Sequence, residues 1–414
     1  MMRIRFENCD LFDGISSDVM RGVHVSIADG RIVAVSETAL SGDVDRIVMG
    51  QGRTLMPGLI DAHVHIAAAT PNPRDLEAMP GSYICHWTAR YLSEMLDRGF
   101  TTVRDVGGGD AGHKRAQAEG LIRGPRLSVS GKALGQTGGH TDLRTTSRVD
   151  TDGVHRMHSS TLGRIVDGVP ECLRAARDEL RLGADFIKVM ASGGVASPTD
   201  PIDWIQFTAE EIRAIVAVAE ASNTYVAAHA YTPKAIEHAA TNGVRTVEHC
   251  NLIDERVASI LKERDCFAVP TLIIYDCLER YANSIGLCAT SREKNKIIRN
   301  AGLNSLGILQ QAGVAIGYGT DLLGWLGKDQ LEEFALRAQV LPAVDVLKSA
   351  TSVNADLINR PDLGRIVEGA TADLVLVDGD PVADISCLSG QGEGISLVVQ
   401  DGLVVKDQER AATS

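Results

Sequence analysis

Apolar and polar residues alternate along this chain with two different periods. Near both ends the alternation has a period of two, in residues 23–28, 31–35, 372–379 and 396–405, which is typical of half-buried β-strands. The Asp29-Gly30 pair between the first two runs predicts a two-residue hairpin turn. We therefore expect strands from both ends of the chain to form one small β-sandwich.

The middle of the chain alternates short apolar runs with segments of helical period. Residues 210–222 show the helical pattern, because their apolar positions recur three and four residues apart. Eight apolar runs predict strands: residues 57–65, 101–105, 126–130, 184–190, 225–230, 246–250, 266–270 and 315–321. Eight alternating strand and helix units predict an α/β fold, namely a (β/α)8 TIM-like barrel with its chemistry at the carboxyl ends of the strands.

The two periods predict a division into two domains. Residues 1–56 and 361–414 are assigned to the β-sandwich, and residues 57–360 to the barrel. A length of 414 residues suits one barrel with a small appendage.

Composition narrows the partners and the compartment. The net charge of −13 argues against binding to nucleic acid or to an anionic membrane surface. No apolar run approaches the roughly 20 residues that cross a bilayer, and the first eight residues carry charges where a signal peptide needs apolar ones. Eight scattered cysteines without a Cys-x-x-Cys pair indicate reduced thiols. We expect a cytoplasmic homo-oligomer.

Candidate metal ligands stand at or near the ends of the predicted barrel strands. Alternate side chains of a strand share a face, so His63 and His65 can reach one ion while Val64 packs away from it. A single strand histidine is more often a buried packing residue than a ligand. A series of such groups is costly to bury without a partner, and this favours a metal centre held by His63, His65, Lys188, His229, His249 and Asp321.

Two further polar residues occupy loops expected at the mouth of the barrel. His140 follows the third predicted strand, and Tyr231 lies two residues after His229. A tyrosine hydroxyl there can donate a hydrogen bond to an oxygen that becomes negative during catalysis; the alternative is an ordinary polar loop residue. Residues 192–194 form either a plain turn or a segment that brings backbone amides near the substrate.

These motifs together resemble the amidohydrolase superfamily over nearly the whole chain. The resemblance rests on residues 57–65, the strand lysine, the two later histidines, the strand-eight aspartate and the closing residues 364–375. It implies that Lys188 is carboxylated by carbon dioxide and bridges two divalent ions, usually zinc. His63, His65, Lys188 and Asp321 would then hold one ion, and Lys188, His229 and His249 the other.

The implied centre is chemically consistent. A carbamate carries two anionic oxygens and can bridge two cations as a carboxylate does. Bound metal lowers the pKa of water from about 15.7 towards 7, and Asp321 can take the proton of the resulting nucleophile and pass it to the leaving nitrogen. The resemblance also disfavours deamination. Deaminase-like members of the superfamily typically lack the strand-four lysine and carry a glutamate a few residues after the strand-five histidine, whereas this chain has Lys188 and no glutamate in the few residues after His229.

Within the superfamily the chain is similar to the Xaa-Pro dipeptidases (prolidases). That likeness assigns Tyr231 to the scissile carbonyl and His140 to substrate binding. Residues 322–327 form an apolar loop after the eighth strand, which suits a proline ring better than a guanidinium. We therefore expect cleavage of Xaa-Pro dipeptides by a metal-bridging hydroxide.

Other functions stay open at this point. A dipeptidase for C-terminal Arg or Lys, a hydrolase of N-acyl amino acids or related amides, and a carbamate or cyclic-amide hydrolase use the same kind of site. A non-catalytic interaction protein is disfavoured, because all six ligand positions are filled. Residues 107–112 match a Gly-x-Gly-x-x-Gly pattern but are interpreted as a barrel loop. A second metal site at His155 and His158 is disfavoured, since no apolar strand precedes them.

Overall fold

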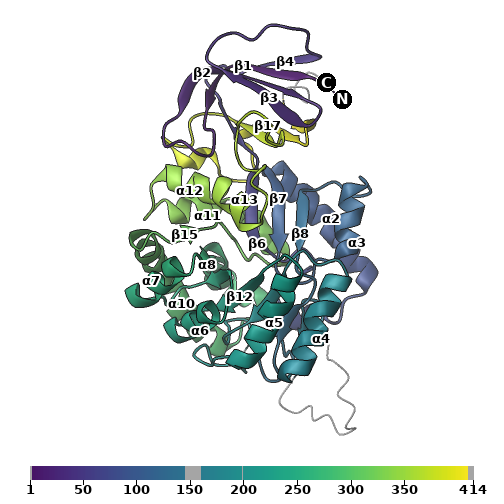
Figure 1. The fold of residues 1–414 in the computed structure, drawn as a ribbon, viewed down its shortest axis with the longest axis vertical. Helices are drawn as coiled ribbons and strands as arrows, with labels where there is room; N and C mark the ends of the chain where they lie inside the picture. The colour runs from purple at the N-terminus through teal and green to yellow at the C-terminus, as the bar shows by residue number, and fades with distance from the viewer. Residues whose placement is uncertain (1, 145–159, 198, 409–414) are drawn as a thin grey trace.

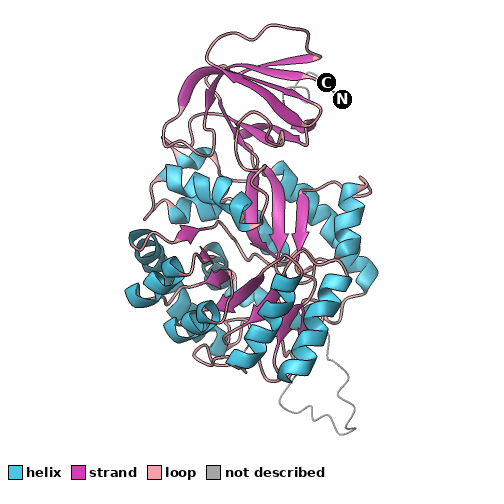
Figure 2. Ribbon diagram, in the orientation of Figure 1, coloured by secondary structure: helices cyan, strands magenta, loops and turns pink. Residues whose placement is uncertain are grey.

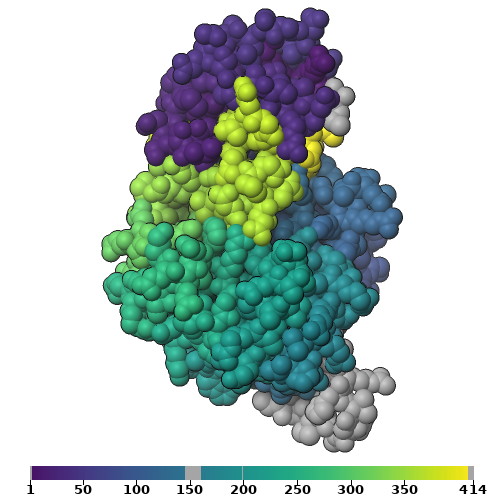
Figure 3. Space-filling view, viewed as in Figure 1, coloured from purple at the N-terminus to yellow at the C-terminus, as the bar shows by residue number. Residues whose placement is uncertain are grey.

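The computed structural model describes residues 2–144, 160–197 and 199–408. Strands from both ends of the chain lie together at one pole of the molecule, and alternating strands and helices fill the rest (Figures 1 and 2). The space-filling view shows the N-terminal residues, in purple, massed at that pole (Figure 3).

The terminal strands form one eight-stranded mixed sheet. Its order is β18-β17-β16-β5-β1-β2-β3, with β4 paired to β1. The bounds are β1 Ile4–Leu11, β2 Met20–Ala28, β3 Arg31–Ser36, β4 Arg46–Met49, β5 Thr54–Pro57, β16 Leu374–Val377, β17 Ile395–Gln400 and β18 Leu403–Asp407. Antiparallel pairing of β5 with β16 joins the two ends of the chain. The predicted hairpin is confirmed, because Asp29 (φ 51°) and Gly30 (φ 76°) turn the chain between β2 and β3.

All the other strands are parallel and form two sheets. The first contains β6 (Leu59–Val64), β7 (Phe100–Asp105) and β8 (Arg126–Val129). The second runs β10 (Gly163–Ile165), β9 (Ala133–Gly135), β11 (Ile187–Met190), β12 (Val226–Ala230), β13 (Thr246–His249), β14 (Phe267–Val269) and β15 (Ala315–Ile316). Each of the eight predicted strands is present. The extra strands β9 and β10 have three residues each, too few for a recognisable period.

Helices alternate with these strands and cover them (Figure 2). They are α1 Pro73–Leu76, α2 Gly81–Asp97, α3 Ala111–Ala118, α4 Gly168–Arg181, α5 Ala209–Ala221, α6 Pro233–Thr241, α7 Glu255–Glu263, α8 Ile273–Arg280, α9 Ala282–Ile285, α10 Ala289–Gln311, η1 Gly324–Asp329, α11 Glu332–Arg337, α12 Ala343–Ser349, α13 Ser352–Leu357 and η2 Ile385–Cys387. The helix predicted at 210–222 is α5, which begins with a capping box between Thr208 and Glu211. Its apolar face, with Ile212 and Ile215, packs in one core with Val189 and Ala228 of the strands. The mixed α/β prediction is confirmed.

Backbone hydrogen bonds connect the edges of the two parallel sheets. The amide of Asp185, just before β11, donates to Val129 O at the end of β8 (2.7 Å). On the other side the amide of Ala62 in β6 donates to Tyr318 O, after β15 (2.9 Å). The carboxyl ends of the strands therefore face one shared space. No helix in the described part of the chain is long and apolar enough to cross a membrane.

Candidate active site

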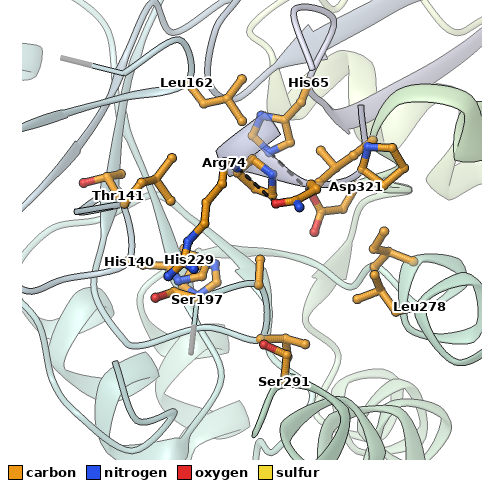
Figure 4. Close-up of a pocket in the computed structure, with 18 of the residues that line it drawn as sticks. His65, Arg74, His140, Thr141, Leu162, Ser197, His229, Leu278, Ser291 and Asp321 are labelled. Carbon is orange, nitrogen blue, oxygen red and sulfur yellow. Dashed lines mark hydrogen bonds and ion pairs between the residues drawn. The ribbon is translucent and has the colours of Figure 1, made fainter. Parts of the chain in front are cut away.

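The six predicted metal ligands converge on one cavity of about 460 Å³. They come from the carboxyl ends of β6, β11, β12 and β13 and from the segment after β15, and Figure 4 shows His65, His229 and Asp321 around the cavity. Segments that lie far apart in sequence meet there because parallel strands end at the same edge. The lining includes His63, His65, Lys188, His229, His249 and Asp321.

Distances between these side chains suit shared ligation. The nitrogen and oxygen atoms that His63, His249 and Asp321 offer lie within 4.8 Å of one another. Asp321 Oδ1 lies 3.4 Å from His63 Nε2 and 3.3 Å from His65 Nε2. The rings of His229 and His249 have centroids 4.5 Å apart. A cation between such donors replaces contacts that otherwise leave several lone pairs facing each other.

Each histidine is oriented by a partner on its other ring nitrogen. Nδ1 of His65 donates to Gly107 O (2.9 Å), and Nε2 of His229 donates to Gly193 O (3.2 Å). Nδ1 of His249 is bonded to the hydroxyl of Thr271 (2.8 Å). Partners of this kind fix ring orientation in metal sites. The donor set therefore fits a metal centre.

A buried ion pair orients the remaining histidine. Glu248 Oε2 accepts from His63 Nδ1 (2.8 Å), and both Glu248 oxygens accept from Arg104 Nη2 (2.7 and 2.8 Å). Glu248 and Arg104 are both fully buried. Burial acts to raise the pKa of Glu248, but the charges of Arg104 and Lys188 outweigh it and hold that pKa below its usual value. The carboxylate is thus an ionised acceptor that leaves His63 Nε2 facing the cavity.

Two buried aspartates join the ligand-bearing segments. Asp61 accepts from the hydroxyl of Thr320 (2.6 Å) and from Gln330 Nε2 (2.9 Å), which ties β6 to the segment that carries Asp321. Asp105 accepts from the amide of Ile66 (2.6 Å) and from two glycine amides of the loop after β7. Sequence reasoning assigned no role to these aspartates or to Glu248. Their position at strand ends was the available signal.

Burial favours the neutral forms of the basic groups. It lowers the pKa of Lys188 from 10.5 to about 8. Burial, together with the other basic side chains of the site, holds the pKa values of His229 and His249 well below the usual 6.5. Neutral imidazole is the form that binds metal, and a neutral amine is the form that reacts with carbon dioxide.

Tyr231 and His140 both line the cavity beside the ligands. The Tyr231 hydroxyl lies 2.8 Å from that of Tyr275, which in turn lies 3.2 Å from His249 Nδ1. The His140 ring stacks on His229, with centroids 4.7 Å apart and planes 19° apart. Both residues that are predicted to contact the substrate therefore lie next to a predicted metal ligand.

The structure favours the plain turn for residues 192–194 and corrects the expectation that the loop of residues 322–327 lines the cavity. The amide of Gly193 donates to Trp204 O (3.1 Å) and that of Gly194 to Asp200 Oδ2 (3.0 Å), so neither is free for substrate. In the loop of residues 322–327 only Leu323 lines the cavity, because residues 324–327 form part of η1 and Leu322 and Leu326 pack into the apolar core behind the cavity-lining residues Tyr231 and Tyr275. The two histidines of the discounted second site, at 155 and 158, lie outside the described residues.

The rim combines apolar walls with one exposed cation that sequence reasoning missed. Arg74, at the start of α1, reaches toward His140, His229 and Ser197 (Figure 4). No periodic pattern marks this residue, because α1 is only four residues long. The apolar lining comprises Leu143, Leu162, Met190, Val195, Ile274, Leu278, Ile285, Leu287 and Leu323.

Few acidic groups face the described part of the cavity. Apart from Asp321 its lining contains Asp142, whose carboxylate is paired with Arg144 (2.6 Å) and also accepts from the amide of Gly138. A guanidinium or ammonium group of a substrate finds no unpaired carboxylate among these residues.

Parallel strands that present histidines, a lysine and an aspartate to one cavity define an α/β enzyme. The chain belongs to the amidohydrolase family, whose sequence model matches residues 54–405, and it is an enzyme that hydrolyses amides. The predicted resemblance is confirmed.

Individual relatives agree with this placement. The ochratoxinase of Aspergillus niger is 33% identical over 346 residues, which is 80% of this chain and 71% of that protein. The crystal structure of a prolidase complexed with N-methylphosphonate-L-proline is 42% identical, with a TM-score of 0.94 over 98% of this chain and 100% of that one. A Xaa-Pro dipeptidase with bound methionine in the active site is 28% identical, with a TM-score of 0.88 over 98% and 100% of the two chains.

Proposed function

We propose that this protein is a binuclear metal-dependent dipeptidase that cleaves Xaa-Pro dipeptides. The observation that carries the proposal is the convergence of four histidines, Lys188 and Asp321 on one cavity. The prolidase and Xaa-Pro dipeptidase structures of similar fold support the substrate class. A second candidate is a hydrolase of N-acyl amino acids or related amides, and the similarity to the A. niger ochratoxinase keeps an amide substrate other than a dipeptide open.

We infer that the two parallel sheets form one (β/α)8 barrel over residues 57–360. The hydrogen bonds from Asp185 to Val129 and from Ala62 to Tyr318 support closure at both edges. Residues 1–56 and 361–414 would then form the appended sandwich. One apolar core that contains Phe6, Leu55 and Leu376 supports this second unit.

The metal assignment follows the donor set. His63, His65 and Asp321 would hold one ion, His229 and His249 the other, and a carboxylated Lys188 would bridge both. The carbamate forms when the neutral Lys188 Nζ attacks carbon dioxide and loses a proton. When bound, two divalent ions, which we assign as zinc, supply the Lewis acidity that activates water and polarises the scissile carbonyl.

The remaining steps belong to side chains of this protein. An Asp321 oxygen accepts the proton of the attacking water and delivers it to the leaving proline nitrogen. His140 and Tyr231 provide the hydrogen bonds to the scissile carbonyl and the terminal carboxylate. Arg74 adds a positive charge for that carboxylate at the rim.

The cavity walls favour proline over the basic alternatives. Its described walls are mainly apolar, and the carboxylate of Asp142 is already paired with Arg144. An uncompensated guanidinium in such a pocket costs desolvation energy that a proline ring does not. A dipeptidase for C-terminal Arg or Lys is therefore less well supported. A carbamate or cyclic-amide hydrolase is also less well supported, because its substrate needs no terminal carboxylate for Arg74 to bind.

Two measurements test the proposal. Elemental analysis of the purified protein is expected to find close to two divalent ions per chain; full activity with a single ion would contradict the binuclear centre. A substrate panel should contain Xaa-Pro, Xaa-Arg and Xaa-Lys dipeptides together with N-acyl amino acids. We expect the Xaa-Pro dipeptides to have the highest kcat/KM. A panel in which N-acyl amino acids have the highest kcat/KM would support the second candidate instead.

A further inference from the structure

We propose that Asp200 is a positioning residue that acts through His140. Asp200 lies in the loop between β11 and α5 and does not line the cavity. By holding Nδ1 of His140 it directs the other ring nitrogen to the substrate. The inference rests on the proposed function, because it assumes that His140 contacts the substrate.

The contact between the two side chains has ordinary hydrogen-bond length and is partly buried. Asp200 Oδ2 lies 3.0 Å from His140 Nδ1, and Asp200 is fully buried. An ionised carboxylate only accepts hydrogen bonds, so Nδ1 is the donor in this pair. Since Nδ1 is engaged, Nε2 is the nitrogen of His140 that remains for the substrate. The stacking of the ring on His229 limits its rotation further.

Asp200 is itself held in place from two directions. The amide of Gly194 donates to Oδ2 (3.0 Å), and Lys294 of α10 donates to the Asp200 carbonyl (2.6 Å). The Lys294 ammonium also donates to Gly194 O (3.0 Å) and Ser197 O (2.7 Å), so one buried lysine ties together the whole loop. A helix remote in sequence thus fixes the backbone of the loop that carries the carboxylate.

Gln206 completes the arrangement by binding both partners. Its Oε1 accepts from the backbone amide of His140 (2.9 Å), and its Nε2 lies 3.4 Å from Asp200 Oδ2. The backbone and the ring of His140 are therefore positioned by one connected set of buried polar groups. Burying a carboxylate costs free energy, and a loop that only reverses the direction of the chain does not require a buried carboxylate.

The decisive experiment is a double-mutant cycle on an Xaa-Pro dipeptide. His140→Gln is expected to lower kcat/KM by roughly ten to a thousandfold, the range for a lost oxyanion donor. Asp200→Ala should give a large part of that loss, and the double variant should be no worse than His140→Gln alone. Asp200→Asn, whose amide oxygen still accepts from Nδ1, should recover most of the activity. Asp203→Ala, an exposed aspartate in the same loop, is the matched control.

Several outcomes separate the possible failures. If His140→Gln keeps the parental rate, the substrate role of His140 in the proposed function is wrong. If His140→Gln is impaired but the Asp200→Ala loss simply adds to it, Asp200 acts on folding and the inference is overturned. Equal losses in Asp200→Ala and Asp200→Asn would also overturn it, since the hydrogen bond would then be irrelevant.

Two further readouts do not depend on turnover. Elemental analysis should find the parental metal content in every variant, and a lost ion in Asp200→Ala would contradict a role confined to His140. Long-range ¹⁵N–¹H spectra of the imidazoles, assigned with His140→Gln, should show a protonated Nδ1 that changes in Asp200→Ala. If Asp200→Ala does not fold, Asp200→Ser is used in its place, because the serine side chain is too short for its hydroxyl to reach His140 Nδ1.

Discussion

Two parts of the cavity are held together in different ways. We call the floor the cavity-lining residues His63, Lys188 and His249 together with Asp61 and Glu248, whose carboxylates accept hydrogen bonds from His63; all five are nearly inaccessible to solvent. We call the rim the loop and helix-end residues Arg74, Gly286 and Thr290, all exposed. In the floor Asp61, His63, Glu248 and His249 are held by hydrogen bonds or ion pairs with neighbouring strands and loops. Lys188 lies near the charges of Glu248 and Asp321, whereas Arg74 at the rim reaches into the cavity.

The difference follows from the cost of burial. A charged group removed from water must be paired almost completely, and removal of one partner leaves the other uncompensated. The floor therefore has little tolerance for substitution. The rim keeps its solvent, so its residues can change and alter which substrate binds while the centre persists.

Lys188→Ala is expected to have the largest effect of any substitution in the floor. No other described residue stands where it could bridge the two proposed ions, so we expect most of the metal to be lost and turnover to fall below detection. Elemental analysis and kinetics on the same preparation measure this. Lys234→Ala, an exposed lysine near the start of α6, is the control. Wild-type turnover in Lys188→Ala would disprove the bridging role.

Asp321→Asn separates metal binding from proton transfer. The amide keeps one oxygen as a ligand but cannot take a proton, so metal content should stay near the parental value while kcat falls by roughly 10²- to 10⁴-fold. Steady-state kinetics combined with elemental analysis distinguish the two effects. A variant that loses metal and activity in proportion would show that Asp321 acts only as a ligand.

The floor was accessible to sequence reasoning because strand periodicity constrains it. The alternation at His63 and His65 and the apolar runs before Lys188 and His249 mark strand ends, and parallel strands bring such ends together. The hairpin at residues 29–30 was predicted for a similar local reason. What these patterns do not contain is the identity of the partners of each ligand, such as the ion pair of Glu248 with Arg104.

The rim was predicted less well because apolar and polar residues do not alternate with a regular period in its loops. The segment after β15 has an apolar sequence, yet Leu322 and Leu326 pack into a core with Tyr275 instead of lining the cavity. Arg74 carries no local signal, since its role depends on where α1 lies relative to distant strands. Tertiary packing decides these positions.

Tyr231→Phe tests the boundary between floor and rim. It removes one hydroxyl from a buried ring, so the fold and metal content should persist while kcat/KM falls by roughly ten to a thousandfold. Each dipeptide should be assayed as the free acid and as the C-terminal amide. An equal loss on both indicates contact with the scissile carbonyl, and a loss confined to the free acid indicates contact with the carboxylate. Unchanged kinetics on both substrates would show that the Tyr231 hydroxyl does not contact the substrate.

Arg74→Met should give the smallest effect, because an exposed cation is screened by water and salt. We expect KM for a free Xaa-Pro dipeptide to rise by roughly two- to fivefold with little change in kcat, as for an exposed ion pair. The increase should shrink at 1 M salt, where the screening length is about 3 Å, and should vanish for the C-terminal amide. Arg90→Met, which alters an exposed arginine of α2 outside the cavity lining, is the control. If Arg74→Met raised KM equally for acid and amide, the arginine would act through shape and not through charge, and the contrast between a paired floor and a solvated, charge-steering rim would fail.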